Sequence, residues 1–423
     1  MTNRWAVLSI LCLARTSMGL HLQVVAAVAP FLVADLGLTY AEIGVLIGIF
    51  MLPGVFLALP GGLISRRVGD KATLVTALGL LLAGTGLLAA SPNFALAAAA
   101  RLLSGAGGTL LTMQVAKIAT DWFAGRELST AIGFLLGTFP LGVALAMATL
   151  GGVAVASSWR LAVALIAATA VPILLVVTLL YRDLPRQDPP TGPAPTPGTL
   201  PHSSTDPAGQ ATHPAAVAVE RLGHPAIGRE ELGPVLVAGV AFALVNAALV
   251  VFTSFTPTLL IERGRSEAQA GVLASWTSWA LMPSVLIAGY LLDRARYLFA
   301  WLVLSALVTA VACLALPIQE PAWFWIVLFG IASAPVTVGS MALPGQVLRA
   351  ESRNWGFGLF FTMNYLGFSL LPPVAGYLLD QTRSTAAPIW FGGLLYLAII
   401  PSVLVFRQLR RRRVAEVPLA VDG

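Results

Sequence analysis

The chain has 423 residues, of which 57% are hydrophobic and only 10% are charged. Soluble domains average about 45–50% apolar and about 25% charged residues, so this composition excludes soluble enzymes, secreted disulfide scaffolds and disordered chains. It predicts an integral membrane protein. The net charge of +6 does not indicate nucleic-acid binding here, because cationic residues collect on the cytoplasmic side of membrane proteins.

Six long apolar runs predict that residues 1–181 form a bundle of six membrane-spanning helices. A span needs about 20 mostly apolar residues to cross about 30 Å of hydrocarbon. The runs lie at 5–30, 43–64, 72–91, 94–117, 129–153 and 159–181. The first run is too long for the apolar part of a cleaved signal peptide, and it contains Arg15, His21 and Gln23, so we expect it to be retained.

A segment of different composition, 182–231, follows the sixth run. It is rich in Pro, Gly, Ser and Thr and has no hydrophobic periodicity, which predicts a flexible cytoplasmic linker. Three of the four histidines lie in it, but their spacing on such a chain favours a solvated linker over a metal site. Cys12 and Cys313 lie in apolar runs and are expected to be buried and free. We expect no metal and no cofactor.

Six further apolar runs predict a second bundle over 232–406, followed by a basic cytoplasmic tail at 407–423. The runs lie at 232–260, 270–291, 297–317, 322–348, 355–379 and 386–406. With the N-terminus inside, most of the 25 Lys and Arg residues fall in cytoplasmic loops. The opposite side receives Arg160, Arg263, Arg265 and Arg383. Both termini are therefore predicted to be cytoplasmic. The Arg-rich, Lys-poor composition is typical of a bacterium with a GC-rich genome, which favours the bacterial inner membrane.

Related loop sequences indicate that the two bundles are copies of one six-helix unit. Residues 61–71 follow the second span and read GGLISRRVGDK, and residues 289–296 follow the eighth span and read GYLLDRAR. A glycine followed by a basic turn at equivalent places indicates an internal repeat. The string Gly-Tyr-Leu-Leu-Asp also occurs at 376–380, at the outer end of the eleventh span.

These features resemble the major facilitator superfamily over the whole length of the chain. The loop signature of that family looks like G-x-L-x-D-R-x-G-R-R/K, and four residues match it: Gly62, Arg67, Gly69 and Lys71. Arg66 and Asp70 depart from it in charge. The resemblance implies an all-α membrane protein with twelve transmembrane helices in two pseudo-symmetric six-helix bundles. It also implies a cytoplasmic gate formed by the matching residues together with Gly289, Asp293 and Arg294 of the second copy.

Two further segments carry narrower resemblances. Residues 101–108, which begin with Arg101, resemble the R-x-x-x-G-x-G pattern of the family's fourth span. The first two spans are similar to those of the cyanate/nitroimidazole permease-type anion porters. That similarity rests on residues 15–23, 30–32 and 59–62.

Arg15 and Arg101 lie deep inside predicted spans, away from the span ends where Lys117 and Arg160 lie, whereas all 19 acidic residues lie in loops, in tails or at helix ends. An arginine at membrane depth costs at least about 2.5–3.5 kcal/mol on insertion scales and cannot lose its proton. Backbone carbonyls, water or an anionic substrate must then supply the negative partner. The guanidinium fork suits a carboxylate or a similar planar anion.

Helical periodicity and the resemblance together define a candidate substrate site. Arg15 shares a face with Gly19, and Arg101 shares a face with Gly105, which leaves room for a ligand or for a close helix. In the superfamily the first, fourth, seventh and tenth helices line a central cavity. The candidate substrate-binding residues are therefore Arg15, His21, Gln23, Arg101 and Asn246. Packing by Arg101, interhelical hydrogen bonds by Gln23 and Asn246, and proton transfer or packing by His21 remain alternatives.

The sequence predicts a monomeric secondary transporter that moves a small, anionic solute by alternating access. Proton symport, exchange for a counter-anion and uniport all stay open. One alternative is multidrug or metabolite efflux, which for cationic drugs usually needs an embedded acid. Another is a non-transporting membrane sensor, which normally carries an appended soluble domain. No nucleophile–base constellation is visible, so an enzyme is not expected. The expected partners are the small-molecule substrate and the lipid bilayer.

Overall fold

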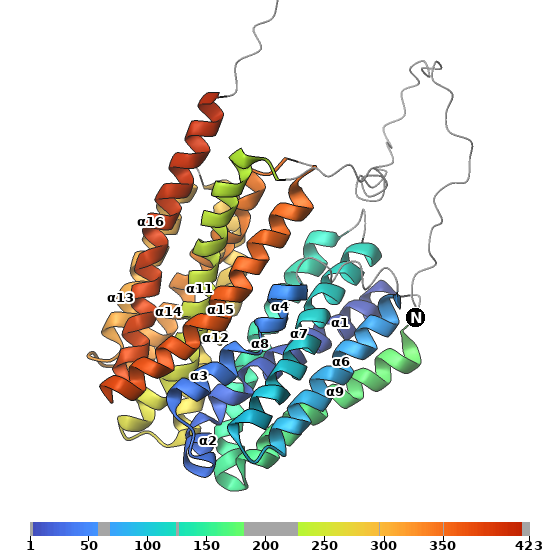
Figure 1. The fold of residues 1–423 in the computed structure, drawn as a ribbon, viewed down its shortest axis with the longest axis vertical. Helices are drawn as coiled ribbons and strands as arrows, with labels where there is room; N and C mark the ends of the chain where they lie inside the picture. The colour runs from blue at the N-terminus through green and yellow to red at the C-terminus, as the bar shows by residue number, and fades with distance from the viewer. Residues whose placement is uncertain are drawn as a thin grey trace, which may run out of the picture.

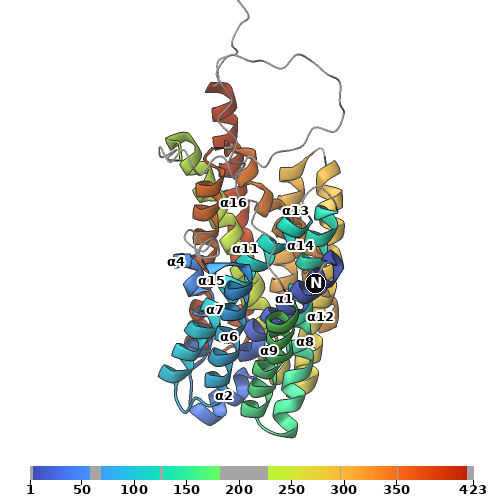
Figure 2. The same ribbon diagram turned by 90° about the vertical axis from the view of Figure 1, so that its right-hand side faces the viewer.

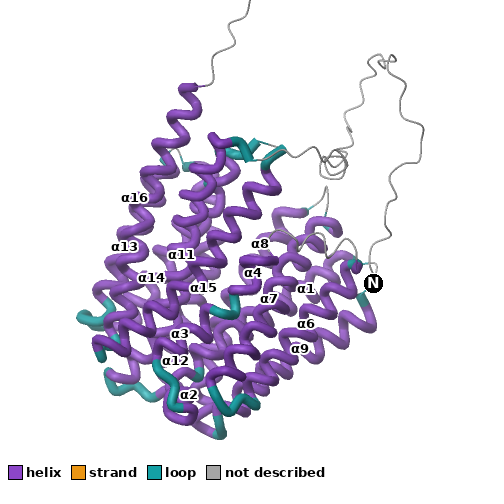
Figure 3. Tube along the Cα trace, in the orientation of Figure 1, coloured by secondary structure: helices purple, strands orange, loops and turns teal. Residues whose placement is uncertain are grey.

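The computed structural model describes residues 3–57, 68–123, 127–181, 227–295, 297–349 and 351–416. Within these ranges every regular element is a helix (Figure 3), and twelve helical segments are long and apolar enough to cross a membrane. The predicted all-α, twelve-span fold is confirmed.

The first six spans precede the central segment. They are α1 (Arg4–Ala27), α3 and α4 together (Tyr40–Gly48 and Leu52–Leu57), α6 (Asp70–Ala89), α7 (Phe94–Trp122), α8 (Leu128–Ala156) and α9 (Trp159–Leu180). A short helix, α2 (Ala29–Leu36), joins the first two spans. The second six are α11 (Arg229–Glu262), α12 (Glu267–Arg294), α13 (Leu298–Ala315), α14 (Ala322–Ala342), α15 (Arg353–Thr382) and α16 (Ala386–Glu416). A single 3₁₀ turn, η1 (Pro344–Gln346), precedes α15.

The end of the predicted linker and the start of the predicted tail both shift in the structure. Helix α11 begins at Arg229, inside the predicted linker, because Glu231 accepts hydrogen bonds from the backbone N–H of Gly228 at 3.2 Å and of Arg349 at 3.0 Å. Helix α16 continues through Arg410 to Glu416, inside the predicted tail, because arginine is a good helix former and the helix need not stop where the apolar run stops. Most of the predicted linker, and residues 417–423, lie outside the described residues.

The spans form two bundles, each around its own apolar core (Figures 1 and 2). Glycines let neighbouring helices touch backbone to backbone within a bundle. A Cβ on Gly19 of α1 would collide with the carbonyl oxygen of Phe139 in α8, and one on Gly142 of α8 would collide with that of Thr16. Small residues at such crossings replace hydrophobic burial as the source of helix association in lipid.

The two halves meet through α3 against α15 and α8 against α12. The closest approaches lie toward the end of the molecule that carries α2, which we call the outer end; the N-terminus and the end of α16 lie at the opposite, inner end (Figure 1). A Cβ on Gly44 would collide with the Pro372 carbonyl, and one on Gly48 with the Ser369 carbonyl.

Farther inward the α8–α12 contact loosens. A Cβ on Gly137 would lie 3.8 Å from the Met282 side chain, and one on Gly133 would lie 3.9 Å from that of Leu286. These are ordinary van der Waals distances between a Cβ and a side chain, whereas the outer contacts join backbones. The halves are therefore packed most tightly at the outer end.

Replacing Gly48 with Leu is expected to force the outer ends apart. The added side chain meets the α15 backbone, and overpacking of this kind costs about 1–3 kcal/mol. Spin labels at the exposed positions Ala34 and Gln381, in a chain with both native cysteines replaced, should report a longer interlabel distance.

Gly79→Leu is the matched control, because nothing lies within 4 Å of a Cβ at that position in α6. An unchanged interlabel distance in Gly48→Leu would show that the contact at the outer end does not require a glycine at position 48.

Candidate functional site

The guanidinium of Arg101 is fully buried and bound by backbone oxygens. Its Nε donates to the carbonyl of Leu46 at 2.9 Å, and its two Nη atoms donate to the carbonyls of His21 at 2.7 Å and Leu22 at 3.0 Å. The charge also lies 4.4 Å from the ring centroid of Phe50, a cation–π distance. Arg101 thus connects α7 to α1 and α3, and it has no exposed surface with which to contact a ligand.

This geometry departs from the expectation that both intramembrane arginines face one ligand. Arg101 reaches α1 six to seven residues beyond Arg15, a separation of about 10 Å along the helix. The glycines beside them face neighbouring helices instead of open space. Gly105 lies against the Phe50 carbonyl, as Gly19 lies against α8. Of the alternatives left open by the sequence, the structure favours packing for Arg101.

Arg15 lies near the middle of α1 and remains half-buried. Its Nε is buried, and no hydrogen bond partner for it is found in the described part of the chain. Its guanidinium carbon lies 5.8 Å from the ring centroid of Phe139 in α8. Tyr365 of α15, in the opposite half, lies within electrostatic range. Arg15 therefore faces the boundary between the two halves and keeps donor capacity that the described residues do not use.

Gln23 and His21 are both buried on α1, with different surroundings. The Gln23 amide nitrogen lies 3.4 Å from the Ser254 hydroxyl of α11 and 3.4 Å from the Met147 sulfur of α8, so this residue bridges the halves. His21 Nδ1 lies 2.7 Å from the Ser17 carbonyl, while its buried Nε2 has no partner among the described residues. His21 does not contact Arg15; its own carbonyl accepts from Arg101.

Asn246 forms an amide pair that the sequence did not suggest. Its Nδ2 donates to the carbonyl of Phe242 at 2.9 Å and to Oδ1 of Asn364 in α15 at 3.0 Å. Asn364 directly precedes Tyr365, but its amide pairs with Asn246 inside the second half, since α11 and α15 belong to the same bundle. The sequence signal that could have identified Asn364 and Tyr365 is their position as adjacent polar residues in an otherwise apolar span.

The first predicted gate loop is described only in part, because Gly62 and Arg67 lie outside the described residues. Gly69 precedes α6 with a φ of 94°, a conformation that favours glycine. The next residue, Asp70, accepts from Gln114 Nε2 at 2.8 Å and from Lys117 Nζ, both in α7. Lys71 lies in the first turn of α6. Both of these donors to Asp70 belong to its own half.

The second predicted gate loop also makes no bond across the halves in the described residues. Gly289 has nothing within 4 Å of a Cβ position, and Asp293 is exposed with no ion pair to any residue that the structure describes. Arg294 stacks over the ring of Tyr290 at 3.7 Å. Gate function for both loops stays a prediction.

Asp380 connects the two halves at the outer end. Its carboxylate accepts from the backbone N–H of Tyr40 at 3.0 Å and of Ala41 at 2.7 Å, the first two residues of α3. Carboxylates at a helix N-terminus satisfy unpaired N–H groups and complement the helix dipole. Asp380 ends the recurrence of Gly-Tyr-Leu-Leu-Asp, a signal that the sequence contained but that was given no role.

Asp380→Asn is expected to loosen the start of α3. Loss of the charged cap costs about 1–2 kcal/mol, which is roughly a 5–30-fold change in an opening equilibrium. Hydrogen exchange at the amides of Tyr40 and Ala41 should accelerate by that factor. The matched control is Asp293→Asn, which removes the same carboxylate from the other copy of the string, and equal protection in both variants would contradict the capping role.

Arg101→Gln is expected to lower the thermal stability of the protein. Three interhelical hydrogen bonds of about 0.6 kcal/mol each in a membrane protein amount to about 2 kcal/mol. The melting temperature in detergent measures the effect, with the exposed Arg265→Gln as the charge-matched control. A melting temperature equal to that of the control would contradict the packing role.

Comparison with known proteins identifies relatives in sequence. A family model described as Major Facilitator Superfamily matches residues 10–329 and 236–421. The hexuronate transporter of Bacillus subtilis (strain 168) is 30% identical over 138 residues, which is 33% of this chain. The match spans 33% of the length of that curated relative as well, so the chain covers only a third of it.

Solved structures share the fold at low sequence identity. A bacterial homologue of the human lysosomal transporter Spinster, in an inward-facing and unoccupied conformation, superposes with a TM-score of 0.68 at 16% identity, covering 96% of each chain. The same homologue in an inward-facing and occupied conformation gives 0.70 at 14% identity, covering 98% of this chain and 97% of the other. The nucleoside transporter NupG gives 0.66 at 14% identity, covering 96% and 99%.

Proposed function

Because the chain belongs to the major facilitator superfamily, and is thus a multi-pass transporter of a small molecule, we propose that its substrate is a small organic anion bound by Arg15. The observation that carries this proposal is the state of the Arg15 guanidinium. It lies in a membrane span, faces the boundary between the halves, and has donor capacity that the described residues leave unused. A carboxylate would satisfy the guanidinium bidentately and neutralise its charge.

Polar side chains of the second half support a substrate that carries hydroxyl groups as well as a carboxylate. The Asn246–Asn364 pair offers both amide donors and carbonyl acceptors, and Tyr365, within electrostatic range of Arg15, offers a phenolic hydroxyl. A sugar acid has this combination of groups. The match to a hexuronate transporter supports the same class. The similarity of the first two spans to cyanate permease-type porters makes small inorganic anions the narrower alternative.

The arrangement of the two halves supports alternating access. At the outer end, glycine contacts and the Asp380 cap hold α3 against α15. At the inner end, Asp70 of the first gate loop accepts hydrogen bonds from α7 of its own half. A site reached from one end at a time is what rocking of two repeats about a central substrate requires.

We place the protein in a bacterial inner membrane with both termini in the cytoplasm, as the distribution of basic residues favours. The inner end then faces the cytoplasm, and an arrangement tight at the outer end would release substrate inward. Uptake is the direction of transport that we propose. Proton symport, anion exchange and uniport are all compatible with this direction.

Thermal stabilisation by ligands tests the proposal. The purified chain is heated with glucuronate, galacturonate, acetate, oxalate, formate, cyanate or nitrate. A ligand at 100 times its dissociation constant adds about 2.7 kcal/mol of stability. We expect at least one carboxylate to stabilise the wild type and to lose its effect in Arg15→Gln. The unliganded variant should be at least as stable as the wild type, because an unpaired intramembrane charge is removed.

Arg101→Gln serves as the crossed control, since it should lower the melting temperature of the free protein and keep the ligand-induced shift. Stabilisation by lipophilic cations or neutral compounds, with none by any anion, would contradict the proposal and favour efflux. Stabilisation by an anion without its uptake into proteoliposomes would favour a non-transporting sensor.

A further inference from the structure

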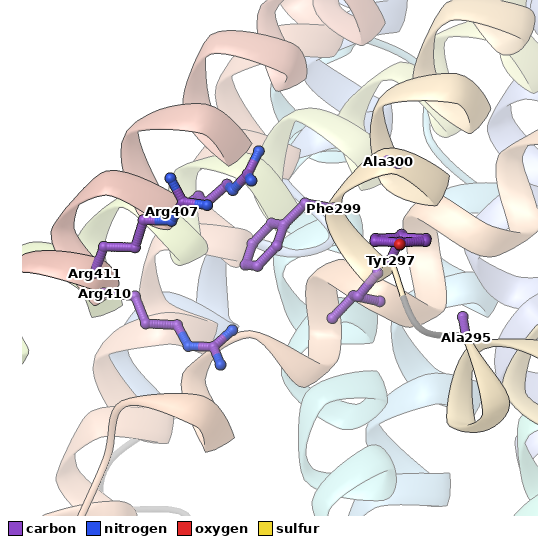
Figure 4. A pocket seen from close by; sticks show the side chains of 8 residues that line it. Ala295, Tyr297, Phe299, Ala300, Arg407, Arg410 and Arg411 are labelled. Atoms are coloured by element: carbon purple, nitrogen blue, oxygen red, sulfur yellow. The ribbon is translucent and has the colours of Figure 1, made fainter. Parts of the chain in front are cut away.

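A cavity of about 490 Å³ lies at the inner end of the second half, away from Arg15. It is formed where the turn before α13 meets the last turns of α16, and Figure 4 shows the side chains around it. Its walls combine aromatic rings, Tyr297 and Phe299, with the guanidinium groups of Arg407, Arg410 and Arg411.

The three arginines give this cavity a strong local positive charge. Arg410 and Arg411 follow Arg407 by three and four residues on α16, so both lie on the face of the helix that carries Arg407. No carboxylate within 4 Å of any of them is found in the described residues. Arg410 donates one hydrogen bond to Oε1 of Gln346 at 2.7 Å. Most donors of the three groups therefore remain open to an anion.

The two helices that form the cavity also carry exposed apolar side chains on the membrane side of the arginines. The apolar part of α16 ends at Phe406, and the arginines follow at once, which places them where a span leaves the hydrocarbon. Large apolar side chains below this level are exposed on both helices: Trp301 at 44% and Leu304 at 53% on α13, and Leu404 at 43% on α16. These surfaces suit the acyl chains of a lipid.

We propose that this cavity binds the headgroup of an anionic phospholipid. The phosphodiester oxygens accept hydrogen bonds from the guanidinium groups, which match phosphate bidentately. The glycerol backbone lies against Phe299, and the acyl chains follow the exposed apolar side chains of α13 and α16. A free phosphate would share the charge complementarity but would leave this apolar surface uncovered.

A bound lipid would connect three parts of the second half. The turn before α13 supplies the aromatic wall, α16 supplies the charges, and Gln346 of η1 is held through Arg410. Neutralising three like charges at one place removes their mutual repulsion. The lipid then acts as a structural ligand that fixes the ends of these helices, and this role does not depend on the identity of the transported substrate.

The test measures lipid binding to the full detergent-purified chain by native mass spectrometry and by melting temperature. Dioleoyl-phosphatidylglycerol and dioleoyl-phosphatidylcholine are compared, since they share acyl chains and differ in net charge. We expect the wild type to bind and be stabilised by the former in preference. The variant Arg407→Gln/Arg410→Gln/Arg411→Gln should bind it roughly tenfold or more weakly, because charge-assisted hydrogen bonds are lost.

Three single variants separate the cavity from general charge effects. Arg411→Gln removes a charge that lines the cavity and should weaken the preference for phosphatidylglycerol over phosphatidylcholine. Arg412→Gln removes the neighbouring charge, which does not line the cavity, and should retain that preference. Gln346→Leu removes the bond to Arg410 while retaining all three charges, and should also keep it. Loss of the preference in Arg412→Gln to the same extent as in Arg411→Gln would overturn the site.

Two other outcomes would overturn the lipid assignment. One is equal binding of both lipids by the wild type. The other is equal stabilisation by inorganic phosphate and phosphatidylglycerol, which would assign the cavity to a free phosphate.

Discussion

A guanidinium group inside a membrane must find negative partners, and the two intramembrane arginines of this protein meet that requirement in different ways. Arg101 is surrounded by carbonyl oxygens of α1 and α3, so its charge is used to hold three helices together. Arg15 has an aromatic face beside it but no oxygen bound to its Nε in the described structure. Arg101 thus stabilises the packing of the helices, whereas Arg15 keeps a donor that a ligand could use.

The packing of the helices also depends on close backbone contacts. Helices in lipid gain little from apolar burial against one another, so packing distance and hydrogen bonds decide where they associate. Glycines supply the distance within each half and also between α3 and α15. The same device thus serves permanent contacts, such as Gly19 against α8, and contacts at the boundary that alternating access would have to break, such as Gly48 against α15.

The spans and the family could be predicted from the sequence because both depend on local patterns: apolar length, basic loops and a repeated glycine-basic turn. The role of Arg101 could not, because it depends on which carbonyls another helix presents, and residue spacing carries no such information. Periodicity placed Gly19 and Gly105 beside the arginines correctly, yet could not tell whether a ligand or a helix fills the space. Asn364 and Tyr365 escaped notice because isolated polar residues in a span have many possible partners.

The Asp380 contact has a consequence for how this protein tolerates change over evolution. Its acceptor is a side chain, but its donors are backbone N–H groups of residues 40 and 41, which every amino acid except proline provides. Drift in the side chains at the start of α3 therefore leaves the bond intact, and no compensating substitution is needed across the interface. Covariation between these positions and residue 380 should be weak among homologous chains, even though the contact joins the two halves.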